Sequence, residues 1–357
     1  MDPISMILPL LAALLAPPLP PVPVPVRSND ISVVGTHNSY KLAMPAATMV
    51  KLRAFDPKIA DALDYAHRPL VEQLDAGARQ LEIDVNYDPD GGHYAKGSSD
   101  PKLLRPGFKV LHIPGIDNSS SCMLLTECLQ QIRSWSAQHP GHVPIMLMFN
   151  AKDEKNAARG GIDALPFTEA AYDALDAEIR SVMTPAMLIV PDDVQGRYPT
   201  LRDAVLANQW PTLDKARGRF LFALDEPPAK VAVYRGKRAS LEGRVFFVNT
   251  DEQSPAAAYL TLNDPIADGA RIKRDVAAGY LVRTRADANT KEARSNDTRP
   301  HDAALASGAQ YISTDYLWPD PRFAGGYQVH LPGGAVARCN PVRRPAGCSD
   351  AMLERKP

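Results

Sequence analysis

Two histidines and a pair of carboxylates lie in or beside short runs of apolar, mostly β-branched residues. His37 lies in ISVVGTHNSY, His112 in FKVLHIPG, and Glu82 and Asp84 in RQLEIDVNYD. Residues two apart on a strand point to the same face, so Glu82 and Asp84 would present both carboxylates to one space. Two imidazoles can serve as base and acid, and clustered carboxylates can hold a hard divalent cation. These residue types therefore suit metal-assisted cleavage of a phosphodiester.

Eight short apolar runs predict the strands that must position these side chains. Helical patterns lie between most of the runs, and several close at a glycine or at a Pro-Gly pair. This alternation predicts an α/β fold, a single (β/α)8 TIM barrel. A doubly wound sheet is the rival, but GTHNSY after the first run is not a glycine-rich phosphate loop. The predicted strands are 31–36, 79–85, 108–113, 144–150, 219–224, 244–249, 279–285 and 311–316.

Polar residues gather at the carboxyl ends of these predicted strands. In a TIM barrel this end carries the active site. A single polar residue at a strand end is common, but a set drawn from many strands indicates a functional site. Closure places the last strand beside the first, so Asp315 is expected to reach His37. The set comprises His37, Asn38, Glu82, Asp84, His112, Asn150, Lys152, Asp225, Glu226, Asn249, Arg283, Arg285, Asp287 and Asp315.

The net charge of the chain gives no support for a nucleic-acid-binding protein. The chain has 357 residues and a formal net charge of −1, so there is no electrostatic reason to expect a nucleic-acid partner.

Residues 1–26 predict an export signal followed by a proline-rich spacer. The apolar run MILPLLAALLA has the length of a signal-peptide core and is too short to span a bilayer. The alternative is an artificial start, with Met6 as the true initiator.

The four cysteines bear on the compartment. They form two local pairs, Cys122 with Cys128 and Cys339 with Cys348, and their spacing matches no zinc pattern. Together with an export signal they predict two short disulfides in a secreted or periplasmic protein, whereas in the cytosol they would be plain thiols. The predicted organisation is a barrel domain over 27–323 and a tail over 324–357 that carries the second disulfide.

Several motifs resemble the calcium-dependent phosphoinositide-specific phospholipase C family, in its bacterial and fungal branch. The matching segments are GTHNSYK, LEIDV, FKVLHIPG, the IMLMFNAKDE region, GYLVRTRADANTKEA and ASGAQYISTDY, which together span about 31–316. The resemblance implies a TIM barrel, bound Ca²⁺ in preference to Mg²⁺, two catalytic histidines, and a phosphoinositide lipid met at a membrane surface.

Carried over by position, the resemblance assigns roles to individual residues. His37 and His112 become the catalytic pair, and Asp315 is expected to orient His37. Lys152, Arg283 and Arg285 fall where the charged head group is expected. Asn150 stands where the family usually has a carboxylate, and an amide oxygen still ligates calcium with one negative charge fewer. The expected metal ligands are Asn38, Glu82, Asp84 and Asn150.

The expected reaction is attack of an inositol 2-hydroxyl on the adjacent phosphorus, with His112 favoured as the acid for the diacylglycerol oxygen. His37 would be the base or would stabilise the transition state. A glycerophosphodiester or sphingomyelin-type phosphodiesterase on the same barrel is an alternative, and a secreted non-catalytic binding protein is another. Turn chemistry accounts for Asp117 and Asn118, and His67 has no assigned role.

Overall fold

The computed structural model describes residues 25–354 of the chain. The predicted export signal and nearly all of the proline-rich spacer lie outside the described residues. Within 25–354, no helix is both long and apolar enough to cross a bilayer.

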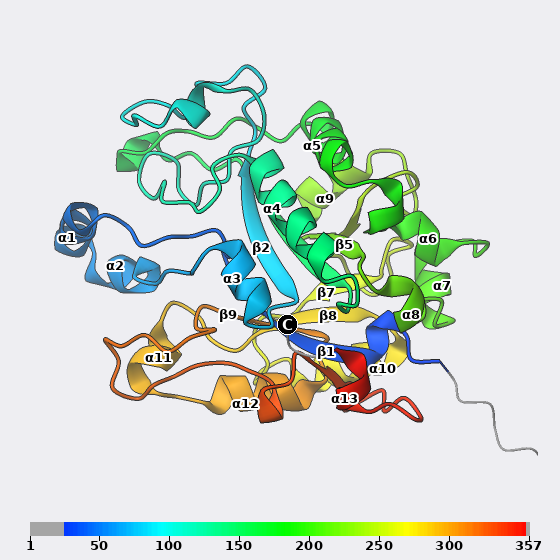
Figure 1. The fold of residues 1–357 in the computed structure, drawn as a ribbon. Helices are drawn as coiled ribbons and strands as arrows, with labels where there is room; N and C mark the ends of the chain where they lie inside the picture. The colour runs from blue at the N-terminus through cyan, green and yellow to red at the C-terminus, as the bar shows by residue number, and fades with distance from the viewer. Residues whose placement is uncertain (1–24, 355–357) are drawn as a thin grey trace, which may run out of the picture.

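Eight parallel strands form the barrel, which confirms the predicted fold class (Figure 1). Neighbouring strands pair in parallel around the ring, and the last strand pairs with the first, Thr314 opposite Thr36. One parallel bridge, between Asn249 and Tyr259, joins the fifth strand of the ring to the sixth and closes it. The strands are β1 (Ile31–Thr36), β2 (Gln80–Asn86), β3 (Ile145–Lys152), β5 (Phe220–Leu224), β6 (Phe246–Val248), β7 (Tyr259–Thr261), β8 (Leu281–Arg285) and β9 (Tyr311–Thr314).

Helices surround the ring, apart from one pair that stands away from it. Figure 1 shows α1 and α2 projecting together at the left edge of the molecule, whereas α4 lies along the strands. The helices are α1 (Ala46–Phe55), α2 (Pro57–Leu63), α3 (Leu70–Asp75), α4 (Leu125–Gln138), α5 (Glu169–Val182), α6 (Pro191–Gln195), α7 (Leu201–Leu206), α8 (Leu213–Ala216), α9 (Pro228–Arg235), α10 (Gly269–Ala278), α11 (Lys291–Ser295), α12 (Arg299–Ser307) and α13 (Asp350–Leu353).

The prediction of a barrel strand over 108–113 is wrong. Lys109 instead forms antiparallel bridges with Asn86 at the end of β2 and with Leu124 just before α4. A short apolar run cannot by itself tell a barrel strand from a loop that folds back over the sheet. The strand that completes the ring is β7, three residues that the apolar pattern did not single out.

Burial of the strands explains their nearly continuous apolar runs. Every residue of β1, β2 and β5 is buried, as expected for parallel strands covered on both faces. Within β2 this burial includes the carboxylates of Glu82 and Asp84. Two buried carboxylates are costly unless each has a hydrogen bond or a counter-charge. Their partners therefore define the centre of the candidate site.

Residues beyond 323 pack at both ends of the barrel, because Tyr327 donates to the Ala286 carbonyl at the rim whereas 337–339 lie along the first half of β1, away from His37. Strand β10 (Ala337–Cys339) pairs antiparallel with β1, and the short β4 (Leu188–Ile189) pairs with β5. The fully buried Arg79 donates to the carboxylate of Glu354, near the end of the described chain. Both predicted disulfides are present, Cys122–Cys128 and Cys339–Cys348.

Candidate active site

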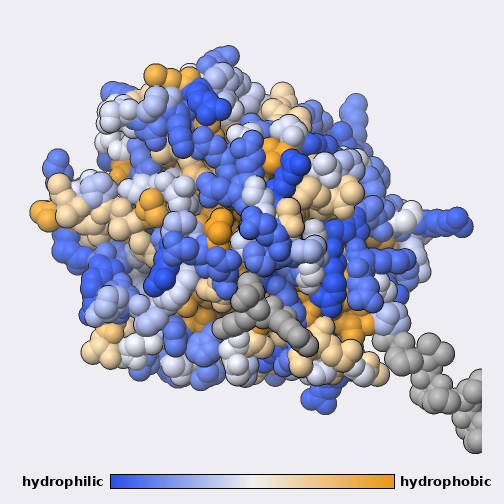
Figure 2. Space-filling view, in the orientation of Figure 1, coloured by the Kyte–Doolittle hydropathy of each residue, from blue (hydrophilic) through white to orange (hydrophobic). Residues whose placement is uncertain are grey.

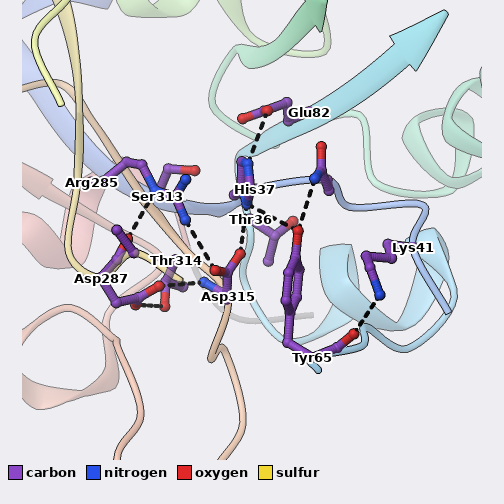
Figure 3. A network of polar contacts seen from close by, with 12 residues as sticks. Thr36, His37, Lys41, Tyr65, Glu82, Arg285, Asp287, Ser313, Thr314 and Asp315 are labelled. Atoms are coloured by element: carbon purple, nitrogen blue, oxygen red, sulfur yellow. Dashed lines mark hydrogen bonds and ion pairs between the residues drawn. The ribbon is translucent and has the colours of Figure 1, made fainter. Parts of the chain in front are cut away.

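His37 and Asp315 meet where β1 and β9 lie side by side (Figure 3). His37 follows β1 and Asp315 follows β9, and their Nδ1 and Oδ1 atoms are 2.7 Å apart, the contact expected from closure of the ring. Arg285 donates to the other oxygen of Asp315 at 3.0 Å. Asp287 accepts the backbone N–H of Asp315 at 2.8 Å and therefore fixes where this carboxylate points.

The electrostatics of this pair set the protonation of the imidazole. Burial lowers the pKa of His37 to about 3, and the charge of Arg285 acts in the same direction. Burial alone would raise the pKa of Asp315, but His37 and Arg285 beside it lower that pKa below its usual range. Asp315 is therefore an ionised acceptor and His37 is neutral at pH 7, with its proton on Nδ1. The lone pair is left on Nε2, which lies 3.6 Å from Glu82 Oε1.

Glu82 is held from inside the barrel by Arg283. The guanidinium donates to Glu82 Oε2 at 2.8 Å, to Asn263 at 2.6 Å and to Ser313 at 3.1 Å. Burial raises the pKa of Glu82 to about 8, against the opposing charge of Arg283. Arg283 is only 2% exposed, so its guanidinium acts on Glu82 rather than as an open clamp for a substrate anion.

Asp84 carries the clearest sign of a missing partner. Its Oδ2 lies 3.4 Å from Lys152 Nζ. Its Oδ1 is buried and has no hydrogen-bond partner among the described residues. Strand register places Asp84 opposite Asn150 on β3, whose side-chain amide donates to the Asp225 carbonyl at 2.5 Å and leaves its own oxygen free of that bond.

Asn38 adds an amide oxygen to the same rim. Its backbone is left-handed, with φ of 47°, a conformation that asparagine tolerates better than most residues. Its Nδ2 donates to the Tyr65 hydroxyl at 2.8 Å, and this bond leaves Oδ1 without a role in the contact with Tyr65. The Asn38 amide oxygen, the Glu82 carboxylate and the unpartnered Asp84 Oδ1 are ligands of the type that Ca²⁺ prefers. Across residues 25–354 no three His, Cys, Asp or Glu side chains cluster as a metal site, so amide oxygens are needed to complete one here.

His112 reaches the site from a loop and not from a strand end. Asn86, the last residue of β2, donates to the Leu111 carbonyl at 2.9 Å and ties the loop to the barrel. His112 Nδ1 lies 2.9 Å from Asp117 Oδ2. Asp117 is buried, so turn chemistry is not a sufficient account of it, whereas Asn118 does accept the Gly115 N–H as a turn residue does.

A buried lysine connects the two histidines. Lys41 Nζ lies 3.5 Å from Asp117 Oδ2 and donates to the Tyr65 carbonyl at 2.8 Å. The Tyr65 hydroxyl in turn lies 3.3 Å from His37 Nδ1 (Figure 3). His67, which had no assigned role, lies 2.7 Å from the His37 carbonyl through its Nε2.

Most of the predicted site residues therefore lie on one rim, in three groups. One group surrounds His37, a second consists of the β2 carboxylates with Lys152, and the third is His112 with Asp117. Lys152 and Arg285 keep 19% and 14% of their side chains exposed, and each pairs with a carboxylate while still accessible to an anion. The residues missed by the sequence patterns are Lys41, Tyr65, His67 and Asp117. Lys41 lies within the THNSYK motif and Asp117 five residues after His112, but neither spacing signals a contact.

Comparisons with known structures support the fold. A calcium-dependent phosphoinositol-specific phospholipase C from a Gram-negative Pseudomonas species is 20% identical, with a TM-score of 0.54, over 88% of this chain and 95% of the other. A Ca²⁺-dependent phosphatidylinositol-specific phospholipase C from Streptomyces antibioticus is 21% identical, with a TM-score of 0.53, over 81% and 95% of the two chains. At this identity the likeness shows the fold alone.

Sequence comparisons bear on the family. An uncharacterised protein of Mycobacterium tuberculosis is 31% identical over 142 residues, which is 38% of this chain and 24% of that protein, so the chain matches about a quarter of this curated relative's length. The family described as "Phosphoinositide phospholipase C, Ca2+-dependent" matches residues 26–341. Because this match covers most of the chain and includes the whole rim described above, the chain belongs to the family of Ca²⁺-dependent phosphoinositide phospholipases C, which are phosphoric diester hydrolases.

Proposed function

We propose that this protein cleaves phosphatidylinositol-type lipids at a membrane surface, outside the cytoplasm. The products would be diacylglycerol and a cyclic inositol phosphate. The observation that carries the proposal is the 2.7 Å contact between Asp315 and His37 Nδ1, which leaves His37 Nε2 free of that bond and 3.6 Å from Glu82 Oε1. This arrangement provides a base at the rim where an oxygen-rich set of ligands and two accessible cations also lie.

His37 is the proposed general base. Its Nε2 accepts the proton of the inositol 2-hydroxyl as that oxygen attacks the phosphorus, and Asp315 stabilises the imidazolium that forms. Arg285 and Lys152 lie within reach of this rim and keep part of their surface open. Their charges suit the phosphoryl oxygens, which gain negative charge during the attack.

His112 is the proposed general acid. Asp117 holds its Nδ1, so Nε2 is the nitrogen that points away from the carboxylate and protonates the departing glycerol oxygen. Its position in a loop beside the rim places it apart from the His37 pair, as two residues that act on opposite sides of one phosphorus require. The same residue could then deprotonate a water that opens the cyclic product.

Asn38, Glu82 and Asp84 would hold the Ca²⁺ of the family, with Asn150 as a further oxygen donor. The buried, unpartnered Oδ1 of Asp84 supports this choice. When bound, the ion supplies charge that stabilises the phosphoryl oxygens and lowers the pKa of a coordinated hydroxyl. Lys152 pairs with Asp84 Oδ2 and Arg283 with Glu82 Oε2, which would leave the other oxygen of each carboxylate for the ion.

A panel of lipids followed by phosphorus NMR tests the proposal. Purified protein is incubated with phosphatidylinositol, phosphatidylcholine, sphingomyelin and glycerophosphoinositol, with Ca²⁺ or with EDTA. We expect a cyclic phosphate from phosphatidylinositol and little turnover of the choline lipids, which lack an internal hydroxyl beside the phosphorus. Rapid cleavage of a choline lipid, or an acyclic product with no cyclic precursor, would instead favour a glycerophosphodiester or sphingomyelin-type activity.

A further inference from the structure

The helical hairpin after β1, residues 46–63, exposes apolar side chains beside the candidate active site. Helix α1 has no buried residue along its length. Val50, Phe55 and Ile59 are 69%, 80% and 43% exposed. Figure 2 shows apolar surface at the left edge of the molecule, where Figure 1 places α1. An exposed apolar helix of this kind indicates a binding surface, because it costs solubility without contributing to the core.

A groove of 410 Å³ runs between this hairpin and two barrel loops. Its size is in the usual range for a small-molecule site, and most of its wall is apolar. Ile113, the residue that directly follows His112, is part of its wall. The lining residues are Thr48, Lys51, Leu52, Phe55, Ile59 and Leu63 from the hairpin, Ile113 and Ile116 from the loop after β2, and Asn156, Ala158 and Arg159 from the loop after β3.

The charges along the groove are of one sign. Lys51 and Arg159 line it, and none of the described residues that line it is acidic. An apolar channel bordered by cations complements a molecule that joins a hydrocarbon chain to an anionic group. A glycerophospholipid has this chemistry, and a water-soluble phosphodiester lacks the chain.

Ion pairs connect the hairpin to neighbouring parts of the rim. Asp61 pairs with Arg53 at 2.6 Å and with Arg294 of α11 at 3.4 Å. Asp64, just after α2, pairs with Arg322 at 2.7 Å. The contacts with Arg294 and Arg322 join the hairpin to α11 and to the segment after β9, which is the strand next to β1.

We propose that this groove binds one acyl chain of the lipid whose leaving oxygen is protonated by His112. The inference rests on the proposed function, because it places the glycerol backbone at His112 and leads the chain over Ile113 into the hairpin. The groove would thus make the enzyme selective for long-chain substrates over short-chain or deacylated ones. Catalysis itself would not depend on the groove.

The test compares long-chain dipalmitoyl with short-chain dihexanoyl phosphatidylinositol, both in detergent mixed micelles. Leu52→Gln and Ile59→Gln make the wall polar while keeping good helix formers. Each should lower kcat/KM for the long-chain lipid about tenfold, the effect of losing apolar contact with roughly two methylene groups. The rate on the short-chain lipid should change less than about twofold. Val50→Gln is the matched control, because Val50 lies on α1, as Leu52 does, but outside the groove.

A second variant separates a groove from general surface hydrophobicity. Ala158→Trp fills the groove with apolar volume, so it should lower long-chain turnover if a chain must enter, and raise it if the hairpin only adheres to lipid. Equal losses in Val50→Gln and Leu52→Gln, or faster long-chain turnover in Ala158→Trp, would overturn the proposal.

A binding measurement distinguishes failure of the groove from failure of the proposed activity. The fluorescent fatty acid cis-parinaric acid, excited directly, should bind the intact wild-type protein and bind Ala158→Trp at least about tenfold more weakly, because the indole would exclude most of the chain. If wild type cleaves no inositol lipid but shows this difference, the activity is wrong and the groove stands. If wild type does not bind the fatty acid, the groove is wrong whatever lipid the enzyme cleaves.

Discussion

Replacing Asp117 by asparagine tests the side of the site that sequence patterns did not reveal. The change keeps the shape of the side chain and removes its negative charge. Asp117 is the residue that holds His112 Nδ1, at 2.9 Å, and it is also the counter-ion of the buried Lys41, at 3.5 Å. We therefore expect two separable losses, one in turnover and one in stability.

The loss in turnover follows from the hydrogen bond to His112. A hydrogen bond to a charged group contributes about 1.5–3 kcal/mol, which corresponds to a roughly ten- to 150-fold fall in kcat. The loss in stability follows from Lys41, which is fully buried. Breaking a buried ion pair costs about 3–5 kcal/mol. We expect the lower end, because Lys41 keeps its bond to the Tyr65 carbonyl and its place over the Tyr65 ring.

Two further variants separate the losses. In Lys41→Met/Asp117→Asn both buried charges are gone, so urea unfolding should recover most of the stability while kcat stays low. Asn118→Ala removes only a turn hydrogen bond to Gly115 and should leave kcat unchanged. The assay is initial-rate cleavage of phosphatidylinositol well below the unfolding transition. The reasoning is refuted if Asp117→Asn keeps kcat within about twofold of wild type, or if the double variant recovers activity along with stability.

Four other perturbations are informative. Asp315→Asn should lower kcat about a hundredfold or more with the fold intact, because the amide no longer fixes the tautomer of His37; circular dichroism and initial rates check this. EDTA should abolish turnover and Ca²⁺ should restore it better than Mg²⁺, and Asn150→Asp should tighten calcium binding in calorimetry if Asn150 is a ligand. Glu354→Gln should lower the free energy of unfolding by about 3 kcal/mol, since the buried Arg79 loses its counter-ion, and unchanged urea unfolding would contradict this.

The parts of the fold that could be predicted from the sequence are those that depend on local patterns of apolar residues. Short, nearly continuous apolar runs identified seven of the barrel strands, because parallel strands are buried on both faces. Strand β7 was not predicted, because three residues are too few to show an apolar pattern. Closure of the ring at this strand depends on a single bridge at Tyr259. Residues 108–113 were wrongly predicted to be a barrel strand, because this apolar, partly β-branched run has the composition of a strand although it folds back over the sheet.

The candidate site also has contacts that could be predicted from the sequence and contacts that could not. The contact between His37 and Asp315 was predictable because closure of a barrel is a property of the topology, whatever the distance in sequence. The contacts of Lys41 with Asp117 and Tyr65 were not, because they depend on how three loops pack and on no repeat or spacing. Arg283 was expected to face a substrate anion, yet its position on β8 turns it inward onto Glu82.

The charges of the rim explain how three buried carboxylates coexist there. Glu82 pairs with Arg283 at 2.8 Å, Asp84 with Lys152 at 3.4 Å, and Asp315 with Arg285 at 3.0 Å. Burial favours the protonated form of Glu82, but once a bound cation ionises it each of these carboxylates has its own cation, and the three pairs then sum to no net charge. A divalent cation added to Asn38, Glu82 and Asp84 would therefore leave the rim positive rather than merely neutral. A phosphodiester carries the opposite charge, so the same pairing that stabilises the rim would also make the loaded site complementary to its proposed substrate.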